Sequence, residues 1–346
     1  MPVISFGDAI YEATAEKMTA NPNMHVLGLG ASYANGLDGT MRDLAVQYSD
    51  RVHDMPCSEN SLTGMAVGMA ISGLTPLAHH GRIEFALHAA DQLLTQAARW
   101  NYMFGGGYPC PLTVRIAMGR QWGNGPQHTM NHKAIFAIPG LKVVCPSTPA
   151  SAKGLLIAAL EDQTPVIYLE SRWLYKLKGS VGTGPVALDK AQVLISGADV
   201  TIVAVGDMVI EALKAAGWLS KLGISAEVID LVSVYPIDRQ TIQESADKTG
   251  RVIVVDSSTP AYSVASEVSA FVRASCAMLT CPDHPCPTAP SLTASYYPTD
   301  RDIVECAAAF LCCGPIELPS VRTFAELNLP PTDNIDDLIA ESVNAG

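Results

Sequence analysis

Short apolar runs alternate with helical segments along most of this 346-residue chain. The apolar runs are residues 24–28, 112–116, 141–146, 165–170, 200–204, 226–230 and 251–255. This alternation predicts parallel sheets covered by helices, because parallel strands need crossover connections and these are usually helical. The length suggests two such domains. Helical and strand periodicity is lost and glycines gather near residues 175–190, so we expect the linker there.

The predicted organisation is therefore α/β throughout. The boundaries we expect are a first domain at 1–180, a linker at 181–194, a second and smaller domain at 195–312, and a C-terminal arm at 313–346. The arm is proposed because the chain becomes proline-rich and acidic from Cys312 onward, which is typical of a segment lying across a surface.

Charge and cysteine usage limit the classes of partner. A net charge of −12 argues against nucleic acid or an anionic membrane surface as the main partner. The nine cysteines are an odd number scattered among apolar runs, which is typical of reduced residues in a cytoplasmic protein. No apolar run reaches about 18 residues, and no signal peptide opens the chain. We expect a cytoplasmic protein without a membrane span.

Residues 54–73 form the stretch with the most chemical information, and Glu59 is its centre. Apolar residues recur at helical spacing after Glu59, which predicts that this carboxylate lies at the start of a buried helix. On another face of the helix, small residues recur every four positions, at Gly64, Gly68 and Ser72. Glycine is unfavourable inside helices, so this spacing predicts close approach of a second helix. A tight helix crossing with a capping carboxylate explains the same residues without any catalytic role.

Two further segments carry polar residues where strands end. The strand beginning at Thr75 ends in His79 and His80, and a long helix is expected from about Ala86 to Met103. A glycine-rich loop, 119–128, follows the strand 112–116 and ends in His128. Loops in this position are where open α/β sheets keep their ligands, although a plain turn with a surface histidine fits as well.

The ordered motifs resemble a known family. They include Asp54-x-Pro56-x-Ser58-Glu59-x4-Gly64-x3-Gly68, Asp91-Gln92, Tyr102-Met103-x-Gly105-Gly106, Gln127-His128, Pro139-Gly140-Leu141-Lys142-Val143-Val144-x-Pro146 and Ala289-Pro290-Ser291-Leu292. Over roughly residues 1–310 the chain is similar to the β subunit of the thiamine-diphosphate-dependent 2-oxo acid dehydrogenase decarboxylases. That group contains the pyruvate, branched-chain and acetoin enzymes.

The resemblance implies a thiamine-diphosphate-binding, pyrimidine-type parallel-sheet domain followed by a transketolase C-terminal-like α/β domain, in an α2β2 assembly. It implies that Glu59 binds the pyrimidine nitrogen of thiamine diphosphate, promoting the imino tautomer that removes the thiazolium proton. Phe85 stands at the aromatic position that packs on the aminopyrimidine, and His128 stands at the active-site histidine, which can pair with a substrate carboxylate or pass a proton.

Departures from the family pattern bear on the cofactor and the substrate. The chain lacks the Gly-Asp-Gly motif that holds the metal, so magnesium and the diphosphate are expected on an α subunit, and the chain alone should be inactive. Where the family usually has Glu-Phe followed by Met or Gln, this chain has His79-His80-Gly81. The change opens space beside the cofactor and makes His79 and His80 candidate substrate residues. Asp256-Ser257-Ser258 replaces the usual His-Glu-Ala. We therefore expect an unusual acyl donor or acceptor.

The resemblance also implies a potassium ion held by backbone carbonyls of Leu112, Ala159, Asp162 and Thr164. Three functions stay open. The first is a decarboxylase subunit that passes an acyl or aldehyde unit, with a lipoyl acyltransferase as partner; the second is a transketolase-like or acyloin-forming carboligase without a lipoyl partner. The third is a non-catalytic interaction subunit, which Glu59 and His128 disfavour.

Overall fold

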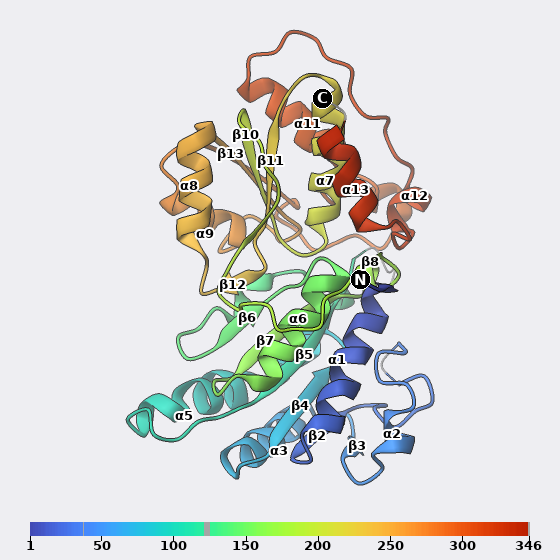
Figure 1. Ribbon diagram of the computed structural model, residues 1–346, viewed down its shortest axis with the longest axis vertical. Helices are drawn as coiled ribbons and strands as arrows, with labels where there is room; N and C mark the ends of the chain where they lie inside the picture. Colours follow the sequence, from blue (N-terminus) through green and yellow to red (C-terminus); the bar gives the residue numbers. More distant parts are fainter. Residues whose placement is uncertain (37, 121–124, 345–346) are drawn as a thin grey trace. The chain divides into compact units, whose positions relative to one another are not determined.

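The structure is a computed structural model that describes residues 1–36, 38–120 and 125–344 (Figure 1). It divides into two compact units. Unit 1 comprises Met1–Met118 and Ile135–Leu188, and unit 2 comprises Gly119–Ala134 and the chain from Asp189 onward. The loop that contains His128, expected within the first domain, thus belongs to unit 2; its residues 121–124 lie outside the described part of the chain.

Unit 1 is built on a parallel sheet with the strand order β6–β7–β5–β4–β2–β3. A separate antiparallel pair, β1 with β8, joins the start of the unit to its end. The strands of unit 1 are β1 (Val3–Ser5), β2 (Met24–Gly28), β3 (Val52–Asp54), β4 (Thr75–His80), β5 (Thr113–Met118), β6 (Lys142–Val144), β7 (Val166–Ser171) and β8 (Lys178–Ser180). Strands β5 and β7 are buried along their whole length, which explains their near-continuous apolar sequences.

The helices of unit 1 are α1 (Phe6–Ala20), α2 (Leu44–Gln47), α3 (Glu59–Ile71), α4 (Ile83–Ala86), α5 (Ala98–Met103) and α6 (Pro149–Glu161). Short helical turns lie at Leu87–Ala89, Lys133–Phe136 and Arg172–Leu174. Helix α1 begins after the Ser5 N-cap and packs against α6 (Figure 1). The expected helix 86–103 is interrupted by a π-helical segment, Asp91–Ala97.

The close helix approach predicted from the small residues of α3 occurs at one of them. A Cβ placed on Gly64 would lie 3.2 Å from the Gln92 side chain, so the π-helical segment passes directly over this glycine. A Cβ on Gly68 would meet no heavy atom within 4 Å. The spacing therefore marks a tight crossing at Gly64 but not one turn later.

Unit 2 contains a five-stranded sheet with the order β14–β13–β10–β11–β9, in which only β9 is antiparallel to its neighbour. The strands of unit 2 are β9 (Gln192–Ile195), β10 (Val200–Ala204), β11 (Ala226–Asp230), β12 (Ser233–Tyr235), β13 (Arg251–Asp256) and β14 (Ser275–Thr280). Its helices are α7 (Met208–Lys221), α8 (Arg239–Thr249), α9 (Val264–Phe271), α10 (Pro290–Thr293), α11 (Asp300–Phe310), α12 (Phe324–Asn328) and α13 (Ile335–Asn344). Helices α8 and α9 cover one face of this sheet, and α7, α11 and α13 cover the other (Figure 1).

The C-terminal segment is more integrated than the expected surface arm. Helix α13 packs against α7, with Ile335 and Ser342 buried on the same face two turns apart. The Ser342 hydroxyl donates a hydrogen bond to the carbonyl oxygen of Leu213 at 3.0 Å. The acidic residues Asp336 and Asp337 lie in the first turn, where negative charge stabilises a helix. Among the described residues, no helix combines the length and apolarity needed to cross a membrane.

Candidate functional site

A cavity of about 230 Å³ opens at the carboxyl ends of the unit 1 strands. Its walls come from the segments that follow β2, β3, β4 and β7, and open α/β sheets bind their ligands at this edge. The site residues predicted for unit 1 line this cavity together: Glu59, His79, His80, Gly81 and Phe85. Two arginines that the sequence analysis did not single out, Arg82 and Arg172, also line it.

Glu59 is the first residue of α3 and lies half-buried in the cavity wall. Ser58 is the N-cap residue, and its hydroxyl donates to Ser61 rather than capping the helix backbone. The Glu59 carboxylate accepts a weak contact from the Cys57 thiol at 3.9 Å. Glu59 lines the cavity, so its carboxylate oxygens can accept hydrogen bonds from a ligand.

Gly81 and Phe85 provide space and an aromatic face. A Cβ on Gly81 would meet no heavy atom within 4 Å, so this position opens the cavity as expected from the sequence. Arg82 is the extended N-cap residue of α4, and Phe85 follows one turn into the helical segment. A half-buried phenyl ring at the wall of a cavity suits a flat ligand, because offset stacking adds to the apolar contact.

His79 and His80 end strand β4 and are almost completely buried. The Nε2 atom of His80 lies 2.9 Å from the Thr63 hydroxyl. Burial, with a smaller contribution from His79, lowers the pKa of His80 to about 3. Burial also lowers the pKa of His79. Both rings are therefore neutral near pH 7, and neither supplies a positive charge for a substrate.

A buried ion pair supports these histidines from the neighbouring strands. Arg115 on β5 donates to Glu170 on β7 through Nε at 2.9 Å and Nη2 at 2.8 Å. The Tyr175 hydroxyl donates to Glu170 at 2.7 Å, and His79 Nε2 lies 3.6 Å from the same carboxylate. Sequence reasoning missed this cluster. Its signal was one basic and one acidic residue inside otherwise apolar runs, 112–116 and 165–170.

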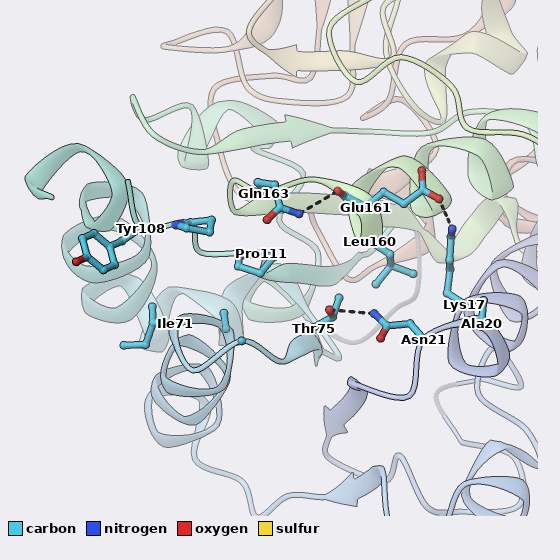
Figure 2. Close-up of a pocket in the computed structure, with 13 residues that line it drawn as sticks. Lys17, Ala20, Asn21, Ile71, Thr75, Tyr108, Pro111, Leu160, Glu161 and Gln163 are labelled. Atoms are coloured by element: carbon cyan, nitrogen blue, oxygen red, sulfur yellow. Dashed lines mark hydrogen bonds and ion pairs between the residues drawn. The ribbon is translucent and has the colours of Figure 1, made fainter. Parts of the chain in front are cut away.

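A second cavity of unit 1, of about 570 Å³, lies at the opposite edge of the sheet, beside the starts of β2, β4, β5 and β7 (Figure 2). Lys17 pairs with Glu161 there, and the Asn21 amide donates to the Thr75 hydroxyl at 3.1 Å. The residues proposed as potassium ligands are sequence neighbours of residues that line this cavity. Two of their carbonyl groups already accept hydrogen bonds. The carbonyl of Leu112 accepts from Val166, and that of Ala159 accepts from Asp162 and Thr113.

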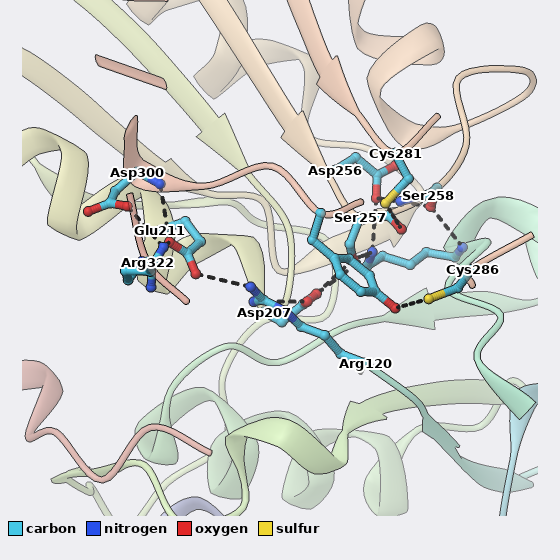
Figure 3. Close-up of polar contacts among 12 residues, drawn as sticks. Arg120, Asp207, Glu211, Asp256, Ser257, Ser258, Cys281, Cys286, Asp300 and Arg322 are labelled. Carbon is cyan, nitrogen blue, oxygen red and sulfur yellow. Dashed lines mark hydrogen bonds and ion pairs between the residues drawn. The ribbon is translucent and has the colours of Figure 1, made fainter. Parts of the chain in front are cut away.

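His128 belongs to unit 2 and ends a helical turn, Pro126–His128, where it is half-buried. Buried cations hold both sides of its loop. Arg120 contacts Glu211 at 3.1 Å and Asp207 at 3.5 Å. Lys133 contacts Asp256 at 2.9 Å. Figure 3 shows Arg120 beside Asp207 and Glu211. These ion pairs explain why residues 119–134 pack with the second half of the chain, and the sequence alone did not predict them.

A third cavity, of about 390 Å³, lies within unit 2 next to this loop. It is lined by Thr129, Asn131, His132 and residues from the two segments 257–259 and 283–286. The cysteines nearby are uncharged thiols: burial raises the pKa of Cys281 and Cys286. No group of three side chains suited to hold a metal ion occurs among residues 1–36, 38–120 and 125–344.

Both units match known protein families. Residues 3–178 match the transketolase pyrimidine-binding domain, and residues 189–303 match the transketolase C-terminal domain. The fold agrees with a solved structure described as "Split gene transketolase, inactive beta4 tetramer", with a TM-score of 0.73 and 25% identity, covering 90% of this chain and 100% of that one. The predicted fold class is confirmed.

Curated relatives extend along nearly the whole chain. It is 38% identical to the acetoin:2,6-dichlorophenolindophenol oxidoreductase subunit beta of Cupriavidus necator, over 86% of this chain and 95% of that protein. It is 37% identical to the 2-oxoisovalerate dehydrogenase subunit beta of Bacillus subtilis, over 89% and 98%. It is also 37% identical to a mitochondrial pyruvate dehydrogenase E1 component subunit beta of Arabidopsis thaliana, over 86% of each.

Fold and site together define a transketolase-type protein of the thiamine-diphosphate-dependent class. Within that class, the chain belongs to the family of the β subunits of 2-oxo acid dehydrogenase E1 components and acetoin oxidoreductases, which act with an α partner. The family recognised from the sequence motifs is confirmed.

Proposed function

We propose that the cavity of unit 1 holds the aminopyrimidine of thiamine diphosphate and that Glu59 activates the cofactor there. The observation that carries this proposal is the convergence of the Glu59 carboxylate, the Phe85 ring and the open position at Gly81 on one cavity. A carboxylate, an aromatic wall and a buried histidine nitrogen that has no partner among the described residues suit a flat heterocycle with polar edges.

In this proposal each residue has a defined task. Glu59 hydrogen-bonds the pyrimidine ring nitrogen and holds a proton there, which favours the imino form of the neighbouring amino group. Phe85 packs on the ring and orients it. When bound, thiamine diphosphate supplies the nucleophilic carbon and the electron sink.

We propose that an α subunit supplies the diphosphate site and its magnesium ion. The chain has no Gly-Asp-Gly motif. The solved split-gene transketolase β chain, described as inactive in its tetramer, supports an incomplete site in chains of this kind. The single chain should therefore turn over no substrate until its α partner is added.

For the acyl acceptor we propose a lipoyl domain, since relatives of this chain include E1 components of dehydrogenases. The test is a lipoyl-acylation assay on the enzyme assembled with its α chain. Acylated lipoyl domain is the expected product. The likeness to a split-gene transketolase favours one alternative, a carboligase. Condensation of two carbonyl compounds without lipoyl acylation would support that alternative and contradict the proposal.

We propose that His128 contacts the reacting substrate and not the cofactor. Replacing His128 by Ala should then lower kcat about 100-fold or more, as expected for loss of a general acid or base, with less than a threefold change in the Kd of thiamine diphosphate. Steady-state kinetics and a fluorescence titration of the assembled enzyme measure the two quantities. The exposed His88→Ala is the matched control. A parallel loss of cofactor affinity and turnover would point to a structural role.

We also propose a potassium ion held by backbone carbonyls of Leu112, Ala159, Asp162 and Thr164. The Asp162 carboxylate accepts from the Thr164 backbone at 2.8 Å and also pairs with Lys142, so the turn that carries the carbonyls is fixed by its own side chains. The Leu112 carbonyl accepts one hydrogen bond and keeps a second lone pair for an ion. At the Ala159 carbonyl the ion would replace one of the two hydrogen bonds, from Asp162 or Thr113.

Potassium should raise the melting temperature of the assembled enzyme relative to tetramethylammonium at equal ionic strength. An ion bound only to the folded state, at a hundred times its Kd, adds about 2.7 kcal/mol. Differential scanning calorimetry across a potassium titration measures the shift. Identical melting temperatures at every potassium concentration would exclude a stabilising site.

A further inference from the structure

The C-terminal segment, residues 313–344, is tied to the rest of unit 2 by side chains of α7 and α11. The Trp218 indole donates to the carbonyl oxygen of Glu317 at 3.0 Å. Arg301 donates to the carbonyl oxygen of Pro319 at 2.6 Å. These bonds fix the stretch between α11 and α12, which lies beyond the residues that match the transketolase C-terminal domain.

Arg322, at the end of this stretch, reaches two acidic side chains through one nitrogen. Its Nη2 atom donates to Asp300 at 2.9 Å and also to Glu211, whose side chain is fully buried (Figure 3). The same Glu211 oxygen accepts from the Asp300 backbone N–H at 3.2 Å. Burial acts to raise the pKa of Glu211, but Arg120 and Arg322 outweigh it and lower this pKa. Glu211 is therefore ionised near pH 7.

The other oxygen of Glu211 faces Arg120, near the start of the segment 119–134 that carries His128. Nη2 of Arg120 lies 3.1 Å from this oxygen, and the Arg120 side chain is only 1% exposed. Glu211 therefore joins Arg322 of the C-terminal segment to Arg120. Because the donors on one oxygen orient the whole carboxylate, they also set where the oxygen that faces Arg120 lies.

Arg120 is connected in turn to the residue that follows His128. Its guanidinium lies over the Tyr297 ring, 5.3 Å from the ring centroid. The Tyr297 hydroxyl donates to Cys286 Sγ at 3.5 Å, and Cys286 is hydrogen-bonded to the side chain of Thr129. Packed and hydrogen-bonded side chains of this kind can carry a displacement from one site to another.

We propose that Arg322 is a positioning residue for His128. It acts through Glu211 and Arg120. The inference rests on the proposed function, in which His128 contacts the substrate. Without the Arg322 charge, Glu211 and Asp300 face each other with no cation between them, and like charges at one site repel. Water also enters a buried cluster, where it weakens the remaining ion pair. Glu211 then holds Arg120 less firmly.

Trypsin measures the release of Arg120, because the protease cuts after an arginine only when that side chain leaves its buried site. In the enzyme assembled with its α chain, Arg322→Gln should be cut after Arg120 about tenfold faster than the wild type, as expected for loss of one coupled contact. Arg322→Lys should restore slow cutting, since both contacts come from one nitrogen that an ammonium group can replace. Arg239→Gln, which breaks an exposed pair, is the matched control and should be cut like the wild type.

Turnover tests the consequence for His128. With an artificial electron acceptor, kcat of Arg322→Gln should fall about tenfold, because a small misplacement of a reacting group can cost up to about 100-fold. The Kd of thiamine diphosphate should be unchanged. Arg322→Lys should recover most of kcat, a rescue that a general loss of stability would not show.

Three results would overturn the inference. The first is wild-type cutting and wild-type kcat in Arg322→Gln. The second is faster cutting at every basic residue, which would show general loosening of the chain. The third is faster cutting after Arg120 with normal kcat, which would show that His128 does not depend on this contact. All three leave the proposed function standing. The role of His128 fails separately, if His128→Ala turns over normally, and the trypsin result does not depend on it.

Discussion

Replacing Glu59 by Gln is expected to lower kcat of the assembled enzyme by about 100-fold to 10,000-fold, the range for loss of a positioned acid or base. The amide can still hydrogen-bond the pyrimidine, but it has no proton to share with the ring nitrogen. Steady-state turnover with an artificial electron acceptor measures the loss.

The fold should survive this change. Glu59 lies half-buried at the first position of α3, and removing one charge at a helix N-terminus costs about 0.3–1 kcal/mol. Assembly with the α chain, followed by size-exclusion chromatography, should therefore be unchanged. Glu305→Gln, at an exposed position of α11, is the matched control and should keep wild-type turnover. Normal turnover in Glu59→Gln would contradict the role assigned to this residue.

Breaking the Arg115–Glu170 pair is expected to have the largest effect on stability. Both side chains are fully buried, so Arg115→Met leaves an uncompensated charge in the core. Removing one partner of a buried pair costs about 3–5 kcal/mol. Urea unfolding of the single chain should show this loss for Arg115→Met and for Glu170→Gln. The double variant should be destabilised by less than the sum of the two.

An exposed pair serves as the control for this cycle. Arg239 and Glu267 are 2.6 Å apart but are 61% and 50% exposed, and such pairs couple by less than about 1 kcal/mol. The pH dependence provides a second check. Because the folded pKa of Glu170, about 2, is below its ordinary value of 4.5, its stabilisation is complete above about pH 4.5. It is then lost progressively as the pH falls toward 2. Equal coupling energies in the two pairs would contradict the account.

The sequence predicted what depends on local pattern. Strand β2 has the predicted bounds, because an apolar run of strand length is a local signal. The helical spacing of apolar residues after Glu59 also placed it at the start of a helix, as the structure does. Residues joined by a single strand or turn, such as His79, His80 and Gly81, could be grouped from the sequence for the same reason.

Contacts between distant segments were beyond this reasoning. Arg115 meets Glu170 because β5 pairs with β7, a neighbour relation that no local pattern specifies. The loop of His128 joins unit 2 because Arg120 and Lys133 find acidic partners there. Helix α13 packs on α7 through its single apolar face. The proline-rich and acidic composition of the whole segment did not indicate this contact.

The central claim, that Glu59 activates thiamine diphosphate in the unit 1 cavity, is tested most directly by hydrogen–deuterium exchange at the thiazolium carbon. Exchange is followed by NMR of cofactor released from the assembled enzyme after quenching at set times, with no substrate present. The account predicts that Glu59→Gln slows this exchange by at least 100-fold, while His128→Ala and the exposed His88→Ala keep rates near that of the wild type. Exchange at the wild-type rate in Glu59→Gln would contradict the claim.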